Sequence, residues 1–381
     1  MNERKTKRLH FYNLDSIRFL AALLVVLAHG FEAWKDFYFK FRYTESDFNS
    51  ITSTKLFETA QTFFLNLGYG VEIFFFMSGF LITYILLVEK RETNSVNILK
   101  FIMRRSLRIW PIYFLLLFVS QPIVDWVDIG NVDYLPNLLF YSNFFIIETV
   151  YFHYPLAHYW SIALEEQFYL FWPILLKYLR LKLAYTLGIL IIISILSRVY
   201  FFYQYPFKHD LYFYIHLLCR MDTLLIGAWF AKLYFNQKLK FPLSKWLFIL
   251  SIGVLFLSFF FTHVKVHYSL LSAIFKKYIY LIPVIYIILY VVSRNTKNSN
   301  FIIRTMNYLG KTSYGIYMYH NFLVIIVIKK ILINNEIYSW SVFTVVYLLS
   351  TILIAMISFE LIEKPILKFK DRFSIIPTRK F

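Results

Sequence analysis

Arg18 and His29 stand in an otherwise apolar stretch, "NLDSIRFLAALLVVLAHGFE", residues 13–32. Eleven residues of α-helix turn through about 1100°, so the two side chains differ by about 20° and share one face. They lie about 16 Å apart along the helix axis. Ionisable groups at membrane depth are costly unless they face a polar interior. The spacing therefore predicts one polar cavity, with a cation near its mouth and an imidazole deeper inside.

His29 is suited to proton transfer, because the unperturbed pKa of histidine, about 6.5, lies near neutrality. An imidazole can also accept an acyl group on a ring nitrogen. Purely structural roles fit as well. His29 would then join two helices, and Arg18 would be an interfacial cation that reaches the membrane surface.

Arg105 and Arg108 lie in "FIMRRSLRIWP" at a spacing of three residues, so both project from one helix face. Guanidinium groups can hold phosphate oxygens in a two-pronged geometry that lysine cannot match. Arg104 points to another side of the helix. The segment therefore predicts a phosphate-binding mouth, and the alternative is a basic flank that only sets membrane topology.

Glu165 and Glu166 lie inside the aromatic segment "HYWSIALEEQFYLFWP", residues 158–173. Adjacent side chains on a helix point about 100° apart, so these carboxylates do not form an acid and base pair. We expect one to face an arginine or the substrate and the other to reach the outer interface. A buried Glu–Arg pair that holds the bundle together is the alternative.

The composition indicates an all-α integral membrane protein that crosses the membrane several times. Of 381 residues, 59% are hydrophobic and 16% charged, and the mean hydropathy is +0.57. Lys and Arg collect in alternate short connections, which predicts that both termini are cytoplasmic. We expect about ten transmembrane helices, near residues 14–32, 69–88, 109–126, 160–176, 183–203, 211–231, 246–262, 278–293, 314–332 and 339–361.

The net charge of +18 does not indicate a nucleic-acid-binding protein, because the basic residues occupy short gaps between apolar runs. Cys219 is the only cysteine, which excludes an intramolecular disulfide and a cysteine-based metal cluster. We expect no metal site. The connection 125–158 carries no Lys or Arg and many aromatic residues. It is interpreted either as an outer cover or acceptor-facing wall, or as a connector at the interface.

Seven segments together resemble the acyltransferase family 3 membrane proteins, bacterial O-acyltransferases that modify surface glycans. In order, they read "LDSIRFLAALLVVLAHG", "GYGVEIFFFMSGFLIT", "RRSLRIWPIYF", "HYWSIALEEQFYLFWP", "RMDTLLIGAWFA", "SYGIYMYH" and "ELIEKP". Each is weak alone, but the ordered set covers nearly the whole chain. Ser16 stands where the family usually has glycine, and Glu72 where it usually has aspartate.

The resemblance implies one transmembrane acyltransferase domain over residues 1–381. Since sixteen residues follow Pro365, no fused esterase-like domain is expected. The family's Arg and His pattern falls on Arg18 and His29, and its Arg-x-x-Arg pattern on Arg105 and Arg108. Its other motifs fall on Trp160, Ser161, Glu165, Glu166, Tyr169, Glu363, Lys364 and Pro365.

The activity implied is acyl transfer in the plasma (inner) membrane, from cytoplasmic acyl-CoA to a hydroxyl of a cell-surface or lipid-linked glycan. Acetyl-CoA is expected as the donor substrate, and no cofactor is expected to be tightly bound. His29 would be the catalytic base or an acyl carrier, with Glu166 or Glu363 orienting it or neutralising the arginines. A transporter or flippase for a lipid-linked glycan, with the same charged face as a wet path, is the alternative.

Overall fold

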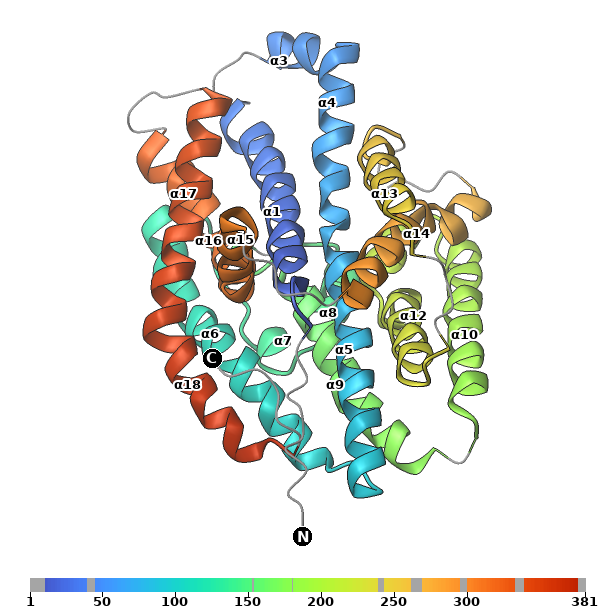
Figure 1. Ribbon diagram of the computed structural model, residues 1–381. Helices are drawn as coiled ribbons and strands as arrows, with labels where there is room; N and C mark the ends of the chain where they lie inside the picture. Colours follow the sequence, from blue (N-terminus) through green and yellow to red (C-terminus); the bar gives the residue numbers. More distant parts are fainter. Residues whose placement is uncertain are drawn as a thin grey trace.

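The computed structural model describes residues 11–39, 45–152, 154–179, 181–238, 243–261, 269–294, 300–332 and 339–375. Within these ranges all regular structure is helical (Figure 1), which confirms the expected all-α class. The helices are α1 (Leu14–Ala33), η1 (Trp34–Phe39), α3 (Glu45–Thr52), α4 (Lys55–Asn66), η2 (Leu67–Tyr69), α5 (Gly70–Thr93), α6 (Ile98–Val127), α7 (Leu135–Leu138), α8 (Ser142–Thr149), α9 (Tyr159–Tyr178), α10 (Leu183–Gln204), α11 (His209–Ile215), α12 (Leu217–Phe235), α13 (Lys245–Ser258), α14 (Leu270–Arg294), α15 (Phe301–Lys311), α16 (Ser313–Ile326), η3 (Val327–Leu332), α17 (Trp340–Ser358), η5 (Phe359–Glu363), α18 (Lys364–Phe369) and η6 (Lys370–Phe373).

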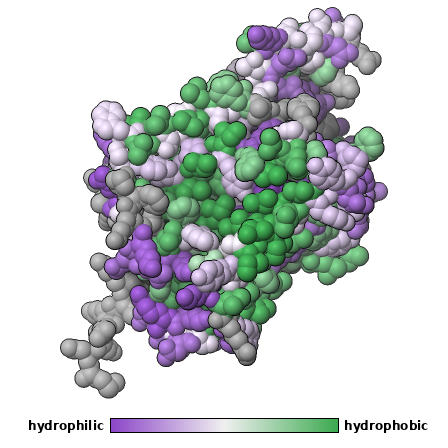
Figure 2. Space-filling model, turned by 90° about the vertical axis from the view of Figure 1, so that its right-hand side faces the viewer, coloured by the Kyte–Doolittle hydropathy of each residue, from purple (hydrophilic) through white to green (hydrophobic). Residues whose placement is uncertain are grey.

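Seven helical stretches of the described chain are long and apolar enough to cross a membrane, so the protein is a multi-pass membrane protein. Figure 2 shows apolar side chains over the middle of one face, with hydrophilic groups gathered toward its lower and upper ends. The other three expected spans fall on α9, α13 and α16, which are helical but too short or too polar to qualify by this measure. A total of ten spans, and cytoplasmic termini, stay predictions. The seven are Leu14–Asp36, Lys55–Thr93, Ile98–Val127, Leu183–Gln204, His209–Phe235, Leu270–Arg294 and Trp340–Phe369.

Helix α1 lies at the centre of the bundle, with α16 on one side and α5 on the other (Figure 1). Its small side chains Ala21, Ala22 and Val25 are completely buried. Small residues allow neighbouring helices to approach closely in a membrane. This central position brings the ionisable residues of α1 into the protein interior.

Helices α5 and α12 meet at two glycines. A Cβ on Gly79 would collide with the backbone carbonyl of Leu224, and one on Gly227 would collide with the carbonyl of Phe76. Each glycine therefore admits the backbone of the opposite helix. Such close contact increases the van der Waals attraction between the helices. In a membrane this attraction drives helix association, because the lipid tails are as apolar as the side chains and the hydrophobic effect contributes little.

Buried ion pairs lie beside this contact. Asp222 of α12 accepts hydrogen bonds from Arg198 at 2.9 Å and from Tyr278 at 2.6 Å, and it also pairs with Lys277. Arg220 pairs with Glu72 of α5 at 2.6 Å. Partners of opposite charge offset the cost of removing each group from water. This explains how α14 can carry Lys277 within an apolar segment.

The 125–158 connection is partly packed into the bundle: Asn137, Asn143 and Ile146 are buried, while Trp126, Leu139 and Tyr151 are exposed. Whether it is an outer cover, an acceptor-facing wall or an interfacial connector stays a prediction. The Phe140 ring lies 4.8 Å from that of Tyr113, which is about 21 Å along α6 from its end. Gln167 of α9 donates to the carbonyl of Phe140 at 2.8 Å and to the side chain of Asn143 at 2.9 Å. Tyr113 donates to the carbonyl of Asn137 at 2.8 Å. These polar side chains satisfy irregular backbone that lipid could not.

Substitution of Gly79 tests the α5 and α12 contact. Gly79→Ala should lower the thermal midpoint in detergent, since backbone must shift at a cost of about 1–3 kcal/mol. Gly253→Ala is the matched control, because a Cβ there meets no atom within 4 Å. Equal midpoints for the two variants would contradict the close packing.

Candidate functional site

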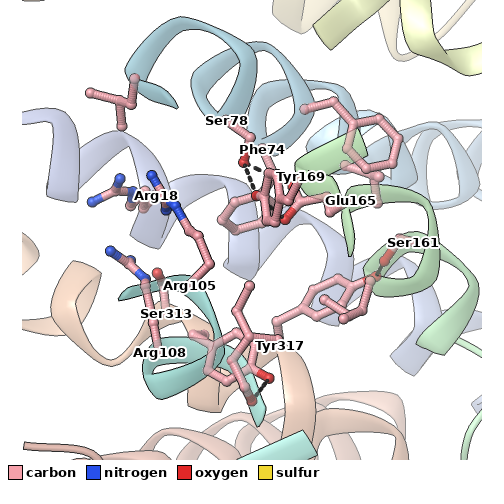
Figure 3. Close-up of a pocket in the computed structure, with 16 residues that line it drawn as sticks. Arg18, Phe74, Ser78, Arg105, Arg108, Ser161, Glu165, Tyr169, Ser313 and Tyr317 are labelled. Atoms are coloured by element: carbon pink, nitrogen blue, oxygen red, sulfur yellow. Dashed lines mark hydrogen bonds between the residues drawn. The ribbon is translucent and has the colours of Figure 1, made fainter. Parts of the chain in front are cut away.

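Three arginines from two helices line one pocket (Figure 3): Arg18 of α1, and Arg105 and Arg108 of α6. The pocket encloses about 760 Å³ including its open mouth. The other walls come from α5, α9 and α16. The structure therefore brings together the three arginines that the sequence singled out.

The arginine pocket carries an excess of positive charge. Arg18 pairs with Asp15 at 2.9 Å. Arg105 lies over the Tyr169 ring, 5.5 Å from its centroid. Within the described ranges, no carboxylate lies within 4 Å of Arg105 or Arg108. Since buried cations require compensation, the pocket is suited to an anionic ligand.

Among the described residues that line the arginine pocket, one is acidic, Glu165. Its carboxylate accepts hydrogen bonds from Ser78 at 2.9 Å and from Tyr169 at 2.7 Å. Tyr169 is also 3.0 Å from the Ser78 hydroxyl, so the three side chains form one network. In Figure 3 this network lies beside Arg105, whose guanidinium is 5.5 Å from the Tyr169 ring centroid. It fixes the carboxylate in place without neutralising Arg105 or Arg108 directly.

Glu166 and Arg104 point away from the pocket, as the helical geometry of their neighbours requires. Glu166 is buried and accepts a hydrogen bond from the Trp110 indole at 3.2 Å. Arg104 pairs with Glu89 at 3.0 Å and donates to the carbonyl of Phe373 at 2.9 Å. The expectation that Arg104 points elsewhere is confirmed. Arg104 ties η6 to the start of α6.

Glu363 and Trp160 are close to the pocket but are not among its lining residues. Glu363 is 6% exposed and would lie 3.1 Å from a Cβ placed on Gly315 of α16. The Trp160 ring packs 5.0 Å from that of Tyr214, and Arg220 lies 5.8 Å above it. These contacts position α9 and α16 around the pocket.

His29 lies in a cluster of three histidines. Its ring is 5.2 Å from that of His320, and His320 is 4.9 Å from His158. His158 and His320 are almost completely buried. The Nδ1 atom of His29 faces the Glu32 carboxylate at 3.6 Å. Among the described residues, neither the Glu166 nor the Glu363 carboxylate lies within 4 Å of a His29 ring nitrogen, whereas that of Glu32 does.

A partition separates the arginine pocket from His29. Tyr317 and Ser161 line the pocket and share a hydrogen bond of 2.6 Å. The Tyr317 ring lies 5.4 Å from each of His158 and His320, so it stands between the pocket and the histidine cluster. His29 is not among the lining residues. The open cavity expected to join Arg18 with His29 is thus interrupted by a side chain from α16.

Comparison with known proteins identifies the family. The model described as "Acyltransferase domain" of acyltransferase family 3 matches residues 11–360. This chain belongs to that family. The match spans the arginine pocket, the partition and the histidine cluster. The resemblance read from seven short motifs is confirmed.

Relatives of this acyltransferase family 3 chain include O-acetyltransferase OatA of Staphylococcus aureus (strain NCTC 8325), 28% identical over 82% of the chain. A protein of S. aureus (strain COL), named as a predicted O-acetyltransferase, is 31% identical over 78% of the chain. The alignments cover 54% and 52% of those relatives, so the chain spans about half their length. No solved structure matches the chain.

Four residues of the site in this acyltransferase family 3 protein were not assigned from sequence: Glu32, His158, Tyr317 and His320. Glu32 could have been found, since it follows His29 by three residues and must share its helix face. The other three lie in quoted motifs, but nothing in their spacing shows that α9 and α16 converge on α1.

Arg104 and Arg108 offer a test of charge pairing. Arg104→Ala should cost about 3–5 kcal/mol of stability, because it leaves the Glu89 carboxylate, 1% exposed, without its cation. Arg108→Ala should be neutral or stabilising, since no carboxylate described lies within 4 Å of it. Thermal midpoints in detergent measure both, and a larger loss for Arg108→Ala would contradict the assignment.

Proposed function

We propose that this chain is a membrane O-acyltransferase of the plasma (inner) membrane. It moves an acetyl or other acyl group from cytoplasmic acyl-CoA to a hydroxyl of a cell-surface or lipid-linked glycan. The observation that carries the proposal is a pocket with two arginines that lack carboxylate partners, in a member of an acyltransferase family. The O-acetyltransferase names of the relatives support acetyl as the group.

The shape of the arginine pocket fits the donor. Coenzyme A carries its phosphates at one end and its thioester at the other, joined by a neutral arm. Arg105 and Arg108 lie at one side of the pocket, and Ser161 lies at the opposite side (Figure 3). Phosphates at the arginines would direct the thioester toward the partition. The Tyr317 and Ser161 hydrogen bond must open for the thioester to reach His29.

Glu32 lies close enough to act on His29 electrostatically, although the 3.6 Å between its carboxylate oxygen and Nδ1 is beyond hydrogen-bond distance. With Nδ1 toward Glu32, Nε2 is the nitrogen left for the substrate. As a base, His29 takes the proton from the acceptor hydroxyl, whose oxygen bonds to the thioester carbon while the C–S bond breaks. The proton then passes to the departing thiolate. As a carrier, His29 would form the acyl bond first and pass the group to the hydroxyl, with the same overall balance.

The donor site is tested by charge removal. Arg105→Ala with Arg108→Ala should abolish the thermal stabilisation that added coenzyme A gives in detergent, because it loses the charge-assisted hydrogen bonds to phosphate. Arg91→Ala is the control, since Arg91 is exposed and pairs with Glu92. Stabilisation of the double variant to the wild-type extent would rule out this donor site.

The catalytic assignment is tested at His29 and Glu32. His29→Ala should lower transfer of labelled acetyl to envelope glycan by about 10² to 10⁴-fold, the range of a catalytic base. Glu32→Gln, which keeps the shape but removes the charge, should give a smaller loss. Coenzyme A should still stabilise both variants. Near-normal transfer by His29→Ala would refute the assignment, and glycan movement without acyl-CoA would favour a transporter.

A further inference from the structure

We infer that a second cavity, on the far side of the histidine cluster from the arginine pocket, binds the saccharide that accepts the acyl group. This inference rests on the proposed function. The second cavity, called here the outer cavity, encloses about 490 Å³ including its mouth. Its lining residues are Ile129, Tyr151, Tyr154, Ile325, Ile328 and Lys329.

Helix α16 and its continuation η3 pass all three features in order. Tyr317 lines the arginine pocket, and His320, three residues later, belongs to the histidine cluster. Ile325 and Ile328 then line the outer cavity. Tyr317 and Ile325 are about 12 Å apart along a helix. The histidine cluster therefore occupies the layer between the two cavities.

The segment that enters α9 passes the same features in the opposite direction. Tyr151 and Tyr154 line the outer cavity, His158 lies in the cluster, and Ser161 lines the arginine pocket. Two chain segments thus agree on the order of the two cavities and the cluster. The order of the two cavities and the histidine cluster therefore follows from two separate chain segments and not from one side chain.

Tyr154 connects the outer cavity with His29. Burial raises the pKa of the Tyr154 phenol, and the nearby carboxylates of Glu32 and Asp36 raise it further. The phenol therefore stays protonated, and it lies within electrostatic reach of Glu32. Because Glu32 is 3.6 Å from the His29 ring, a hydroxyl held beside Tyr154 would lie close to the proposed base.

The lining of the outer cavity suits a sugar. Tyrosine rings offer apolar faces to the C–H groups of a pyranose, while the ammonium of Lys329 and the phenols can bond its hydroxyls. In the described chain, no carboxylate lies within 4 Å of Lys329. Its neighbour Lys330 is engaged differently, over the Trp126 ring at 5.2 Å. A lipid tail would need neither the ammonium nor the phenols.

The test uses the purified full chain, labelled acetyl-CoA, and envelope polysaccharide from a strain lacking this gene. Tyr151→Ala with Lys329→Ala removes one ring and the ammonium while leaving the buried Tyr154 intact. We expect the KM for polysaccharide to rise about tenfold with kcat little changed, as for a lost substrate contact. Stabilisation by coenzyme A should equal that of the wild type, because the arginine pocket is untouched.

Tyr203→Ala with Lys330→Ala is the matched control, since Tyr203 is 69% exposed on α10 and Lys330 does not line the cavity. A KM for the Tyr151 and Lys329 variant equal to that of the control would overturn the inference. Failure of the proposed function would look different. The wild type itself would then neither be stabilised by coenzyme A nor transfer acetyl.

Discussion

The cost of holding charge inside an apolar bundle governs this structure. Asp222 has two cations and a phenol around it, and Glu72 has Arg220 and the hydroxyl of Thr223. These groups join α5, α10, α12 and α14, and each offsets the desolvation of another. Against that background, Arg105 and Arg108 stand out, because they face a cavity instead of a carboxylate. The phosphates of the proposed donor would supply the negative charge that this arrangement lacks.

Packing of neighbouring segments around α1 also forms the histidine cluster. Three imidazoles, from α1, from the N-cap of α9 and from α16, meet in one layer, and Tyr317 separates them from the arginine pocket. A closed partition would keep a thioester away from water and from acceptor until the donor is seated. Exclusion of water also strengthens the electrostatic contacts that hold the donor.

The re-entrant 125–158 connection shows how irregular backbone is accommodated within the bundle. Gln167 of α9 donates to the carbonyl of Phe140 and to the side chain of Asn143, and Tyr113 of α6 donates to the carbonyl of Asn137. The same connection then supplies Tyr154 to the outer cavity and leads directly into α9. The connection contributes Ile129, Tyr151 and Tyr154 to the outer cavity, and His158 at its end belongs to the histidine cluster.

The sequence by itself determined the membrane class and most helix positions, because an apolar run long enough to cross a bilayer is typical of a transmembrane helix. It also determined that Arg105 and Arg108 face one side of α6 and Arg104 another, since residues on one helix have fixed relative directions. Spacing along one helix cannot report what a neighbouring helix inserts. The Tyr317 partition, the pairing of His29 with His320, and the return of the 125–158 connection were decided by tertiary packing. The first two depend on contacts between segments more than a hundred residues apart, and the third on hydrogen bonds between residues 24 to 27 apart, which no local pattern encodes.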